Sequence, residues 1–413
     1  MIKREISSDS GNIGNRCDIC IGCGRCRTKN PFSVTVDSGL TEEVFPLSNH
    51  DGRRLVTVDI GTTTIAMQLY GRDGKVDAVH AVVNPQTEYG ADVLSRIQAA
   101  EDAGTAAKLQ DMVQDVLEQG FSDFKGRLSE NESLFGVIAA NTPMVYLLMG
   151  YDAGELGRAP FSVSHPSGIN ADIRGVSCVI FPCLSAFVGG DIVAGIYASG
   201  MTEAEKPVLL IDLGTNGEIV LGSKDKILAC ATAAGPAFEG GANRGIWGAD
   251  MVSLIARIKR EHIVDETGLL SDAYFESGVN IGDVSVSQKS IRQIQLAKGA
   301  IAAGIRILAK EYGIGYSEIS KVVLAGGFGY YLNPQDAAEI GLLPEELVKK
   351  SVAGGNTALA GALLLGREIL AETWGEAVTK AATGEAFLKC RTKIINLAEH
   401  PDFQENYLEE MNL

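Results

Sequence analysis

Apolar and polar positions alternate along this chain in blocks that predict an α/β protein beginning near Arg54. Apolar runs of strand length are separated by segments whose apolar residues recur at helical spacing. In the first half we expect strands at 55–60, 64–70, 76–83 and 134–140, and helices at about 91–102 and 105–126. Another helix should begin at Asn141-Thr142-Pro143, because Asn caps a first turn and Pro is tolerated within it.

The second half repeats this alternation. We expect strands at 208–213, 217–220 and 322–325, a long amphipathic helix at 288–312, and a helix that opens at about 354. A further helix starts from the pair Gly189-Gly190 and carries Asp191 in its first turn. Asp191 either approaches a ligand cleft or is an ordinary first-turn acid favoured by the helix dipole, and both interpretations stay open.

Two predicted hairpins share one polar signature between their strands. The first reads Asp59-Ile60-Gly61-Thr62-Thr63, and the second reads Asp212-Leu213-Gly214-Thr215-Asn216-Gly217. Each Asp closes a strand, where its carboxylate can hold Mg²⁺, and the backbone N–H groups after it can face a phosphate. In the second turn Asn216 and Gly217 both tolerate positive φ. One such hairpin is a weak signal, whereas two, each between strands, form a strong one.

Composition and charge limit the kinds of function that this protein can have. The 413 residues suffice for two or three domains, and 48 glycines, well above the usual ~7%, indicate many tight turns. A net charge of −16 disfavours a nucleic-acid or anionic-membrane partner. The N-terminus lacks an apolar core and no uncharged apolar run reaches membrane-spanning length, so we expect no signal peptide, no membrane segment and a cytoplasmic protein.

Four cysteines near the N-terminus form a C-x₂-C-x₂-C-x₂-C run: Cys17, Cys20, Cys23 and Cys26. In a cytosolic chain such density favours metal binding, and an iron–sulfur cluster, most plausibly [4Fe–4S], is the first interpretation. Zinc is the alternative, although zinc sites usually split their cysteines into two separated pairs, and a reduced cysteine-rich tail is the third. The ferredoxin run ends in C-x₃-C-P, which this sequence does not match, so whether all four cysteines are ligands stays open. The other cysteines lie in or beside apolar stretches, where free cysteine packs as a core residue: Cys178, Cys183, Cys230 and Cys390.

Three further segments are candidates for close approach to a nucleotide. Small residues dominate Ala233-Ala234-Gly235-Pro236. A buried strand ends in Gly326-Gly327, a pattern suited to a ribose or phosphate. Asn356 opens a helix whose N-terminal N–H groups can face the same ligand.

The two Asp-x-Gly-Thr hairpins and the late Gly-Gly turn together resemble the superfamily of acetate and sugar kinases, heat-shock chaperones and actin. That resemblance implies two ribonuclease-H-like lobes that close on Mg-ATP, plus a small N-terminal cysteine-rich segment. The first hairpin would be phosphate loop one, the second phosphate loop two, and Gly326-Gly327 the adenosine turn. We expect the cysteine-rich segment and linker, the first lobe, the second lobe and a C-terminal extension to occupy residues 1–50, 51–205, 206–370 and 371–413.

Several short motifs are similar, more narrowly, to those of the ATP-dependent reductive activators of corrinoid proteins. They are Asn84-Pro85-Gln86, Tyr89-Gly90-Ala91-Asp92, Ala234-Gly235-Pro236-Ala237-Phe238-Glu239-Gly240, Gln295-Leu296-Ala297-Lys298-Gly299-Ala300 and His400-Pro401-Asp402-Phe403. Such activators restore the cobalamin of a methyltransferase after accidental oxidation. The resemblance implies that an iron–sulfur centre passes one electron to Co(II), giving Co(I), and that ATP hydrolysis makes this uphill step possible.

The resemblance also implies partners and site residues. The partners would be the corrinoid protein of a methyltransferase system and an external low-potential electron donor such as ferredoxin, with a homodimer as the default assembly. Asp59 and Asp212 would hold Mg²⁺, and the phosphates would contact Gly61, Thr62, Thr63, Gly214, Thr215, Asn216 and Gly217. Either Glu218 or Glu239 would orient the attacking water. The iron–sulfur part of this chain differs from that of known family members. It comprises about 50 N-terminal residues with one cysteine run, whereas members carry a larger iron–sulfur domain.

Three alternatives remain at this stage. A related ATP-driven electron donor to 2-hydroxyacyl-CoA dehydratases shares one cluster across a dimer, with its cysteines inside the nucleotide-binding body. A small-molecule kinase with a structural metal tail would need an acceptor pocket and a catalytic acid beside the cleft. A non-redox scaffold would leave the cysteine run without a purpose.

Overall fold

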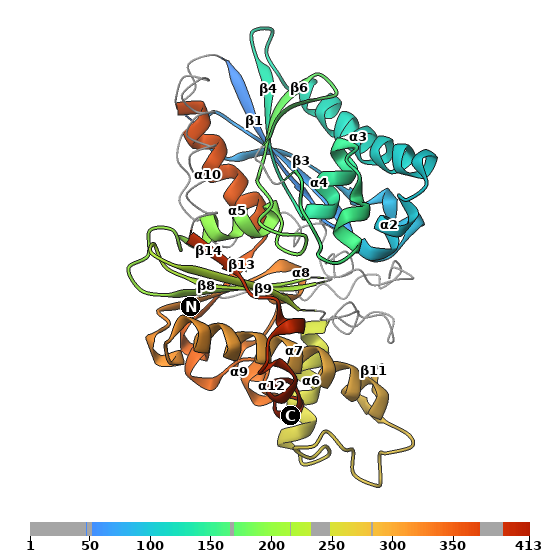
Figure 1. Cartoon of the computed structure of the whole chain (residues 1–413), viewed down its shortest axis with the longest axis vertical. Helices are drawn as coiled ribbons and strands as arrows, with labels where there is room; N and C mark the ends of the chain where they lie inside the picture. The colour runs from blue at the N-terminus through green and yellow to red at the C-terminus, as the bar shows by residue number, and fades with distance from the viewer. Residues whose placement is uncertain are drawn as a thin grey trace, which may run out of the picture.

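The computed structural model describes residues 47, 52–165, 169–214, 216–232, 248–281, 284–371 and 391–413. Two six-stranded sheets form its framework, with helices on both outer faces and two helices between the sheets (Figure 1). This arrangement confirms the predicted α/β fold with two lobes. Within these ranges no helix is both long and apolar enough to cross a membrane.

The first sheet is built around β1, which ends at Asp59-Ile60. β1 pairs antiparallel with β2 and parallel with β4. The strand order across the sheet is β3 (Val76–Val83), β2 (Thr64–Tyr70), β1 (Arg53–Ile60), β4 (Ser133–Ala140), β6 (Val176–Ile180) and β5 (Ile169–Ile173).

The second sheet repeats this plan around β7, which ends at Asp212-Leu213. β7 pairs antiparallel with β8 and parallel with β12. The order is β13 (Ser351–Gly355), β12 (Lys321–Ala325), β7 (Val208–Leu213), β8 (Gly217–Gly222), β9 (Ile227–Thr232) and β14 (Thr392–Ile394). The equivalent hairpins β1–β2 and β7–β8 therefore place Asp59 and Asp212 at corresponding positions.

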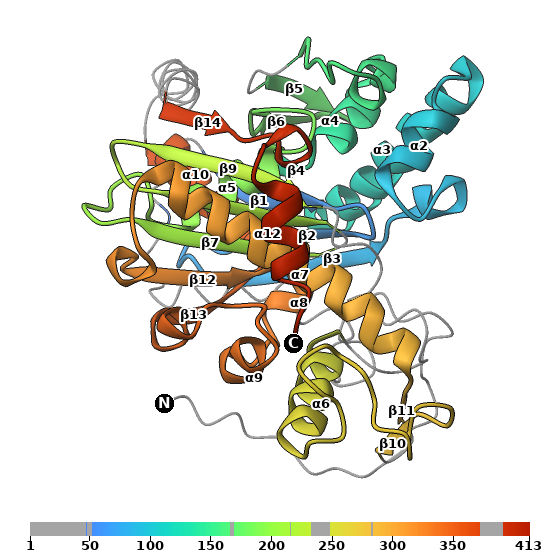
Figure 2. The same ribbon diagram turned by 60° about the horizontal axis from the view of Figure 1, so that its bottom comes forward.

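Helices cover both sheets, and their boundaries follow the predicted periodicity closely. The outer face of the first sheet carries α2 (Val93–Ala99), α3 (Ala103–Lys125) and α4 (Thr142–Met149), while α5 (Gly190–Ser199) and α10 (Thr357–Ala371) lie between the sheets (Figure 1). The second lobe carries α6 (Gly248–Arg260), α7 (Gln288–Tyr312), α8 (Gly326–Gly329), α9 (Pro334–Glu339), α12 (Phe403–Glu409) and the small hairpin β10 (Val279–Ile281) and β11 (Val284–Val286). The C-terminal α12 packs along α7 (Figure 2). Short 3₁₀ turns occupy Pro85–Tyr89, Ala153–Gly157, Tyr316–Glu318, Glu345–Lys350 and Leu397–Glu399.

One hydrophobic core joins the two lobes. Alternate residues of β7 face opposite sides, so Leu209 and Ile211 pack under the outer helices while Leu210 faces the other way. Leu210 belongs to a buried cluster that also contains Leu55 of β1 and residues of α5 and α10. The backbones of α5 and α10 approach closely at Gly361, where an added Cβ would overlap the Ala194 carbonyl group. The two sheets are therefore supported by one shared layer.

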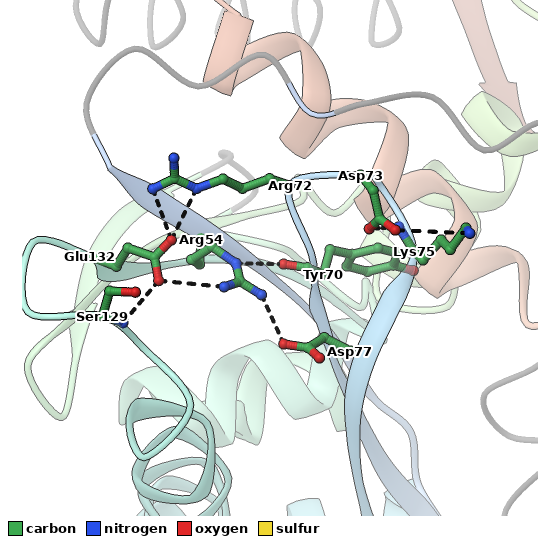
Figure 3. Close-up of polar contacts among 8 residues, drawn as sticks. All are labelled: Arg54, Tyr70, Arg72, Asp73, Lys75, Asp77, Ser129 and Glu132. Carbon is green, nitrogen blue, oxygen red and sulfur yellow. Dashed lines mark hydrogen bonds and ion pairs between the residues drawn. The ribbon is translucent and has the colours of Figure 1, made fainter.

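A charged cluster lies near the opposite end of β1 from Asp59 (Figure 3). Arg54 donates from Nε to the Tyr70 carbonyl at 2.8 Å and pairs with Asp77 at 3.0 Å and Glu132 at 3.5 Å. Arg72 pairs with the same Glu132 at 2.9 Å. The buried ends of Arg54 and Glu132 thus keep charged partners, as burial of a charge requires. We assign this cluster to the stability of the first lobe.

Candidate nucleotide site between the lobes

Asp59 and Asp212 lie at the carboxyl ends of the central strands, where open α/β sheets bind their ligands. In the first sheet Asp59 pairs with Ala66 of β2 and Ala139 of β4. In the second, Asp212 pairs with Glu218 of β8. The two hairpins therefore differ chemically: the second carries an additional acid directly across from its aspartate.

Four carboxyl groups influence one another at this place. Asp191, in the first turn of α5, raises the pKa of Asp59, Asp212 and Glu218 through like charge. Burial, the largest cause, raises the pKa of Asp59 and Asp212 to about 7 and that of Asp191 to about 6. Burial also raises the pKa of Glu218 well above its usual range. Of the two interpretations of Asp191, the cleft position is therefore the one that the structure supports.

These acids suit a cation that is shared with a ligand. Within the described ranges, no group of three or more His, Cys, Asp or Glu side chains is close enough to hold a metal ion by itself. Mg²⁺ commonly takes one or two carboxylates and completes its shell with water and substrate phosphates. Buried acids whose charges repel one another are stabilised when such a cation is present. The residues present therefore fit Mg²⁺ bound together with a phosphorylated ligand.

The raised pKa values predict how stability depends on pH. Between the unfolded value near 3.8 and the folded value of about 7, the folded protein binds more protons at Asp59 and Asp212 than the unfolded chain does. The free energy of unfolding of the metal-free protein should therefore fall as pH rises through this window. We expect Tm to decrease from pH 5 to pH 8, and to decrease less in Asp212→Asn. Parallel pH profiles for the two proteins would contradict the assignment.

The predicted adenosine turn lies directly against phosphate loop two. Gly326 has φ +78°, and an added Cβ would overlap Asp212 Oδ1 and lie 2.5 Å from the Leu213 carbonyl oxygen. Only glycine fits both the backbone conformation and the space. Gly327 follows it in α8. The end of β12 is thus held close to Asp212.

Gly326→Ala should therefore impair the nucleotide site as well as strain the backbone. We expect a loss of about 1–2 kcal/mol in stability from the positive φ and, from displacement of Asp212, a loss of about tenfold or more in ATP affinity. Gly313→Ala is the matched control, because Gly313 has φ +89° but an added Cβ meets nothing within 4 Å. Titration calorimetry and thermal unfolding of both variants test this. Equal ATP affinity in the two variants would contradict it.

The turn of the second hairpin differs from the expectation. Gly217 has no positive φ and is already the first residue of β8, paired with Leu213. Before it, the Gly214 N–H donates to the Asn216 carbonyl at 3.0 Å. The prediction that places Gly217 in the turn was wrong, because this residue already pairs within the β7–β8 ladder. An added Cβ at Gly214 would meet no atom of the described residues within 4 Å.

Three side chains that support phosphate loop one were not predicted as site residues. Asn84 Nδ2 donates to the Gly61 carbonyl at 2.9 Å, and Arg96 Nη2 donates to the Thr62 carbonyl at 2.5 Å. Asn141 Nδ2 donates to Thr62 Oγ1 at 3.1 Å, while its Oδ1 caps α4. Asn84 and Asn141 each precede Thr-Pro or Pro at a helix start, which was the available signal. Arg96 lies in a short helix, and no pattern in the neighbouring sequence marks it as a site residue.

Asn356 connects the two lobes. Its Nδ2 donates to Asp59 Oδ2 at 2.7 Å, and its Oδ1 accepts the Leu359 N–H at the start of α10. The hydrogen bond lowers the pKa of Asp59 and so favours the ionised acid. Thr357, the next residue, likewise lowers the pKa of Asp212. The start of α10 therefore contacts Asp59 directly and influences the pKa of Asp212.

A cavity of about 620 Å³ lies beside the acids and is lined by both lobes. Its walls are mainly apolar: Leu94 of α2, Phe187 before α5 and Leu397 near the C-terminus are examples. Asn141 and Glu218 also line it. Among its described lining residues Glu218 is the only charged one. The cavity thus suits apolar or neutral groups.

Some predicted site residues lie outside the described residues. They are Cys17, Cys20, Cys23, Cys26, Thr215, Gly235 and Glu239. The structure therefore tests neither the cluster ligands nor the choice of Glu239. Three described cysteines, Cys178, Cys183 and Cys230, are free and buried, as predicted for core residues.

Comparisons with known proteins agree with this architecture. Residues 55–204 match the RACo middle region, and residues 206–244 and 242–413 match the C-terminal domain of RACo, the ASKHA domain. The corrinoid activation enzyme RamQ of Eubacterium limosum is 29% identical over 426 residues, covering 86% of this chain and 69% of that protein. The Co(II) methylated amine-specific corrinoid protein reductase of Methanosarcina barkeri is 22% identical, covering 77% of this chain and 70% of that protein.

A solved structure gives the same relationship. The reductive activator for corrinoid,iron-sulfur protein superposes with a TM-score of 0.73 at 26% identity, covering 89% of this chain and 67% of that chain. The family matches extend over almost all of residues 55–413 and include both hairpins, both aspartates and the adenosine turn. This chain therefore belongs to the RACo family.

Proposed function

We propose that this protein is an ATP-dependent reductive activator of a corrinoid protein, which it returns from Co(II) to Co(I) by transfer of one electron. The observation that carries the proposal is the RACo family match along both lobes, together with relatives named for activation or reduction of corrinoid proteins. The acidic, glycine-lined site between the lobes supports the ATP requirement.

The energetic reason for ATP follows from redox arithmetic. Raising one electron by ~59 mV costs about 1.4 kcal/mol. A gap of a few hundred millivolts therefore exceeds what a handful of surface contacts between two proteins can supply. Coupling to nucleotide hydrolysis provides the difference, provided that the nucleotide changes the conformation of the protein.

The following residues of this chain would bind and hydrolyse ATP. Asp59 and Asp212 hold Mg²⁺ directly or through water, with Asp191 adding negative charge nearby. The backbone N–H groups of phosphate loops one and two contact the β- and γ-phosphates, where charge builds in the transition state. Glu218 orients the attacking water, because it faces Asp212 across the hairpin and lines the adjacent cavity.

The electron route begins in the N-terminal cysteine run. Cys17, Cys20, Cys23 and Cys26 would hold a 4Fe–4S cluster, which when bound supplies the single electron for Co(II). An external low-potential donor such as ferredoxin would reduce the protein again. The chain would supply four thiolate ligands to the cluster, because a cysteine binds iron in its thiolate form.

The described cysteines argue against the dehydratase-activator alternative. That class needs cysteines in the nucleotide-binding body that reach a cluster shared with a second subunit. Here Cys178, Cys183 and Cys230 are buried, and burial raises the pKa of Cys178 to about 12, so its thiol stays protonated. None of these three side chains is suited to ligate a shared cluster at the surface.

The cavity weighs against the kinase alternative. It does lie beside an acid, Glu218, as a phosphoryl acceptor site would. Its described lining is mainly apolar, however, and contains no basic side chain that could pair with a carboxylate acceptor such as acetate.

A cobalt-reduction assay tests the proposal. The anaerobically reduced protein is mixed with the Co(II) form of a methyltransferase corrinoid protein, and Co(I) is followed by its absorption. We expect Co(I) to form with Mg-ATP and not with ADP or a non-hydrolysable analogue. Co(I) formation that is independent of ATP, or ATP-dependent phosphorylation of a small molecule without cobalt reduction, would overturn it.

A further inference from the structure

Arg96 is a fully buried arginine behind phosphate loop one. It extends from α2, and its Nε donates to the Gly90 carbonyl at 2.9 Å. Its Nη2 donates to the Thr62 carbonyl at 2.5 Å, and Nη1 lies 3.7 Å from Met144 Sδ. The guanidinium therefore joins the loop before α2 to the phosphate loop.

These contacts fix the direction of the loop's peptide groups. In a trans peptide the carbonyl and the following N–H point in opposite directions. The carbonyls of Gly61, Thr62 and Thr63 accept from Asn84 Nδ2, Arg96 Nη2 and the Asn84 N–H, all within the first lobe. The N–H groups of Thr62, Thr63 and Thr64 must then point away from that support. This is the orientation that phosphate oxygens require.

Arg96 also contributes positive charge. Burial lowers its pKa to about 10, which leaves it charged at neutral pH. The carboxylate that acts on it is Asp92, the capping residue of α2, whose oxygens are engaged by Ser95. A buried charge is costly unless it is paired and hydrogen-bonded, and Arg96 has the Asp92 charge and the carbonyls of Gly90 and Thr62. A bound triphosphate would supply a further anion.

We propose that Arg96 is a positioning residue of the nucleotide site: through the Thr62 carbonyl it fixes the loop Gly61–Thr64 with its N–H groups toward the phosphates before ATP binds. The inference rests on the proposed function, since it assumes that this loop binds ATP. It assigns to α2 a role in phosphate recognition, and it takes Gly326-Gly327 in the second lobe as the segment that would contact the nucleoside.

The test compares two ligands on one variant. In Arg96→Met, with all donors removed and the side-chain length kept, we expect the affinity for Mg-ATP to fall about tenfold or more. Affinity for adenosine, which contacts the second lobe, should change by less than about twofold. Titration calorimetry with ATP and with adenosine measures both. Arg174→Met, which removes surface ion pairs with Asp111, Asp115 and Glu118 in the same lobe, is the matched control and should alter neither.

Further outcomes separate this inference from the proposed function. Arg96→Lys keeps the charge but cannot reach both carbonyls, so its ATP affinity should lie between those of wild type and Arg96→Met; it also serves if the Met variant does not fold. Equal weakening of ATP and adenosine would reduce Arg96 to a structural residue and overturn the inference. Unchanged ATP affinity would do the same. Failure of the wild type itself to bind ATP would instead overturn the proposed function.

Discussion

Asp212→Asn should lower kcat for ATP hydrolysis by about 100-fold or more, since removal of one preorganised electrostatic group typically costs about 10²–10³. Asp212 closes β7 beside Asp191, Asp59 and Glu218, and Asn has nearly its shape but not its charge. At the proposed site, Mg²⁺ would then have one carboxylate fewer to hold it beside the phosphates. Because the substitution removes a repelled buried acid, the folded protein should be as stable as the wild type or more so.

Asp225→Asn provides the control for this variant. Asp225 is exposed in the turn between β8 and β9, at the far end of the same sheet from Asp212. It should keep wild-type hydrolysis. Steady-state ATPase kinetics at saturating Mg²⁺ measure both variants. An Asp212→Asn enzyme that retains more than about a tenth of the wild-type kcat would remove Asp212 from the metal site.

Cys23→Ser should abolish cobalt reduction while ATP hydrolysis stays within about twofold of wild type, because Cys23 belongs to the N-terminal cysteine run and none of the residues proposed to contact ATP does. Serine cannot replace a thiolate that ligates iron. Cobalt reduction should fall to the rate measured without the protein. Iron content, ATPase rate and Co(I) formation are measured on the same preparation.

Cys178→Ala is the matched cysteine variant. Cys178 is buried in the first lobe next to Gly136, so alanine removes a thiol from the core without touching the N-terminal run. It should lose about 1 kcal/mol of stability and keep cobalt reduction. Loss of ATP hydrolysis in Cys23→Ser would contradict the assignment of electron transfer to the cysteine run and of ATP hydrolysis to the two lobes.

The strands that carry the candidate site could be predicted, because the signal for each strand and its turn comes from residues adjacent in the sequence. Asp59 and Asp212 each end an apolar strand before Gly-Thr, so the strand end, the carboxylate and the phosphate-facing turn follow from neighbouring residues. The α7 boundaries, Gln288–Tyr312, likewise follow from one unbroken helical period. The family resemblance carried by the repeated hairpin also implied the two-lobe fold.

Contacts between distant segments were not predictable in the same way. Arg96 reaches the Thr62 carbonyl from another element, and no local pattern marks a buried arginine that binds carbonyl groups. Asn356 was expected to open a helix, but its bond to Asp59 depends on how the lobes pack. β14 comes from the expected C-terminal extension and pairs with β9, which sequence spacing alone does not show.

Electron paramagnetic resonance of one anaerobic sample tests the central claim most directly, because a reduced 4Fe–4S cluster and Co(II) both give signals. The reduced protein is mixed with the Co(II) corrinoid protein, and spectra are recorded before and after addition of Mg-ATP. We predict that both signals persist without ATP and decline together, in equal amounts, once ATP is added. An absent iron signal, or a Co(II) signal that declines while the cluster signal stays constant, would contradict the account.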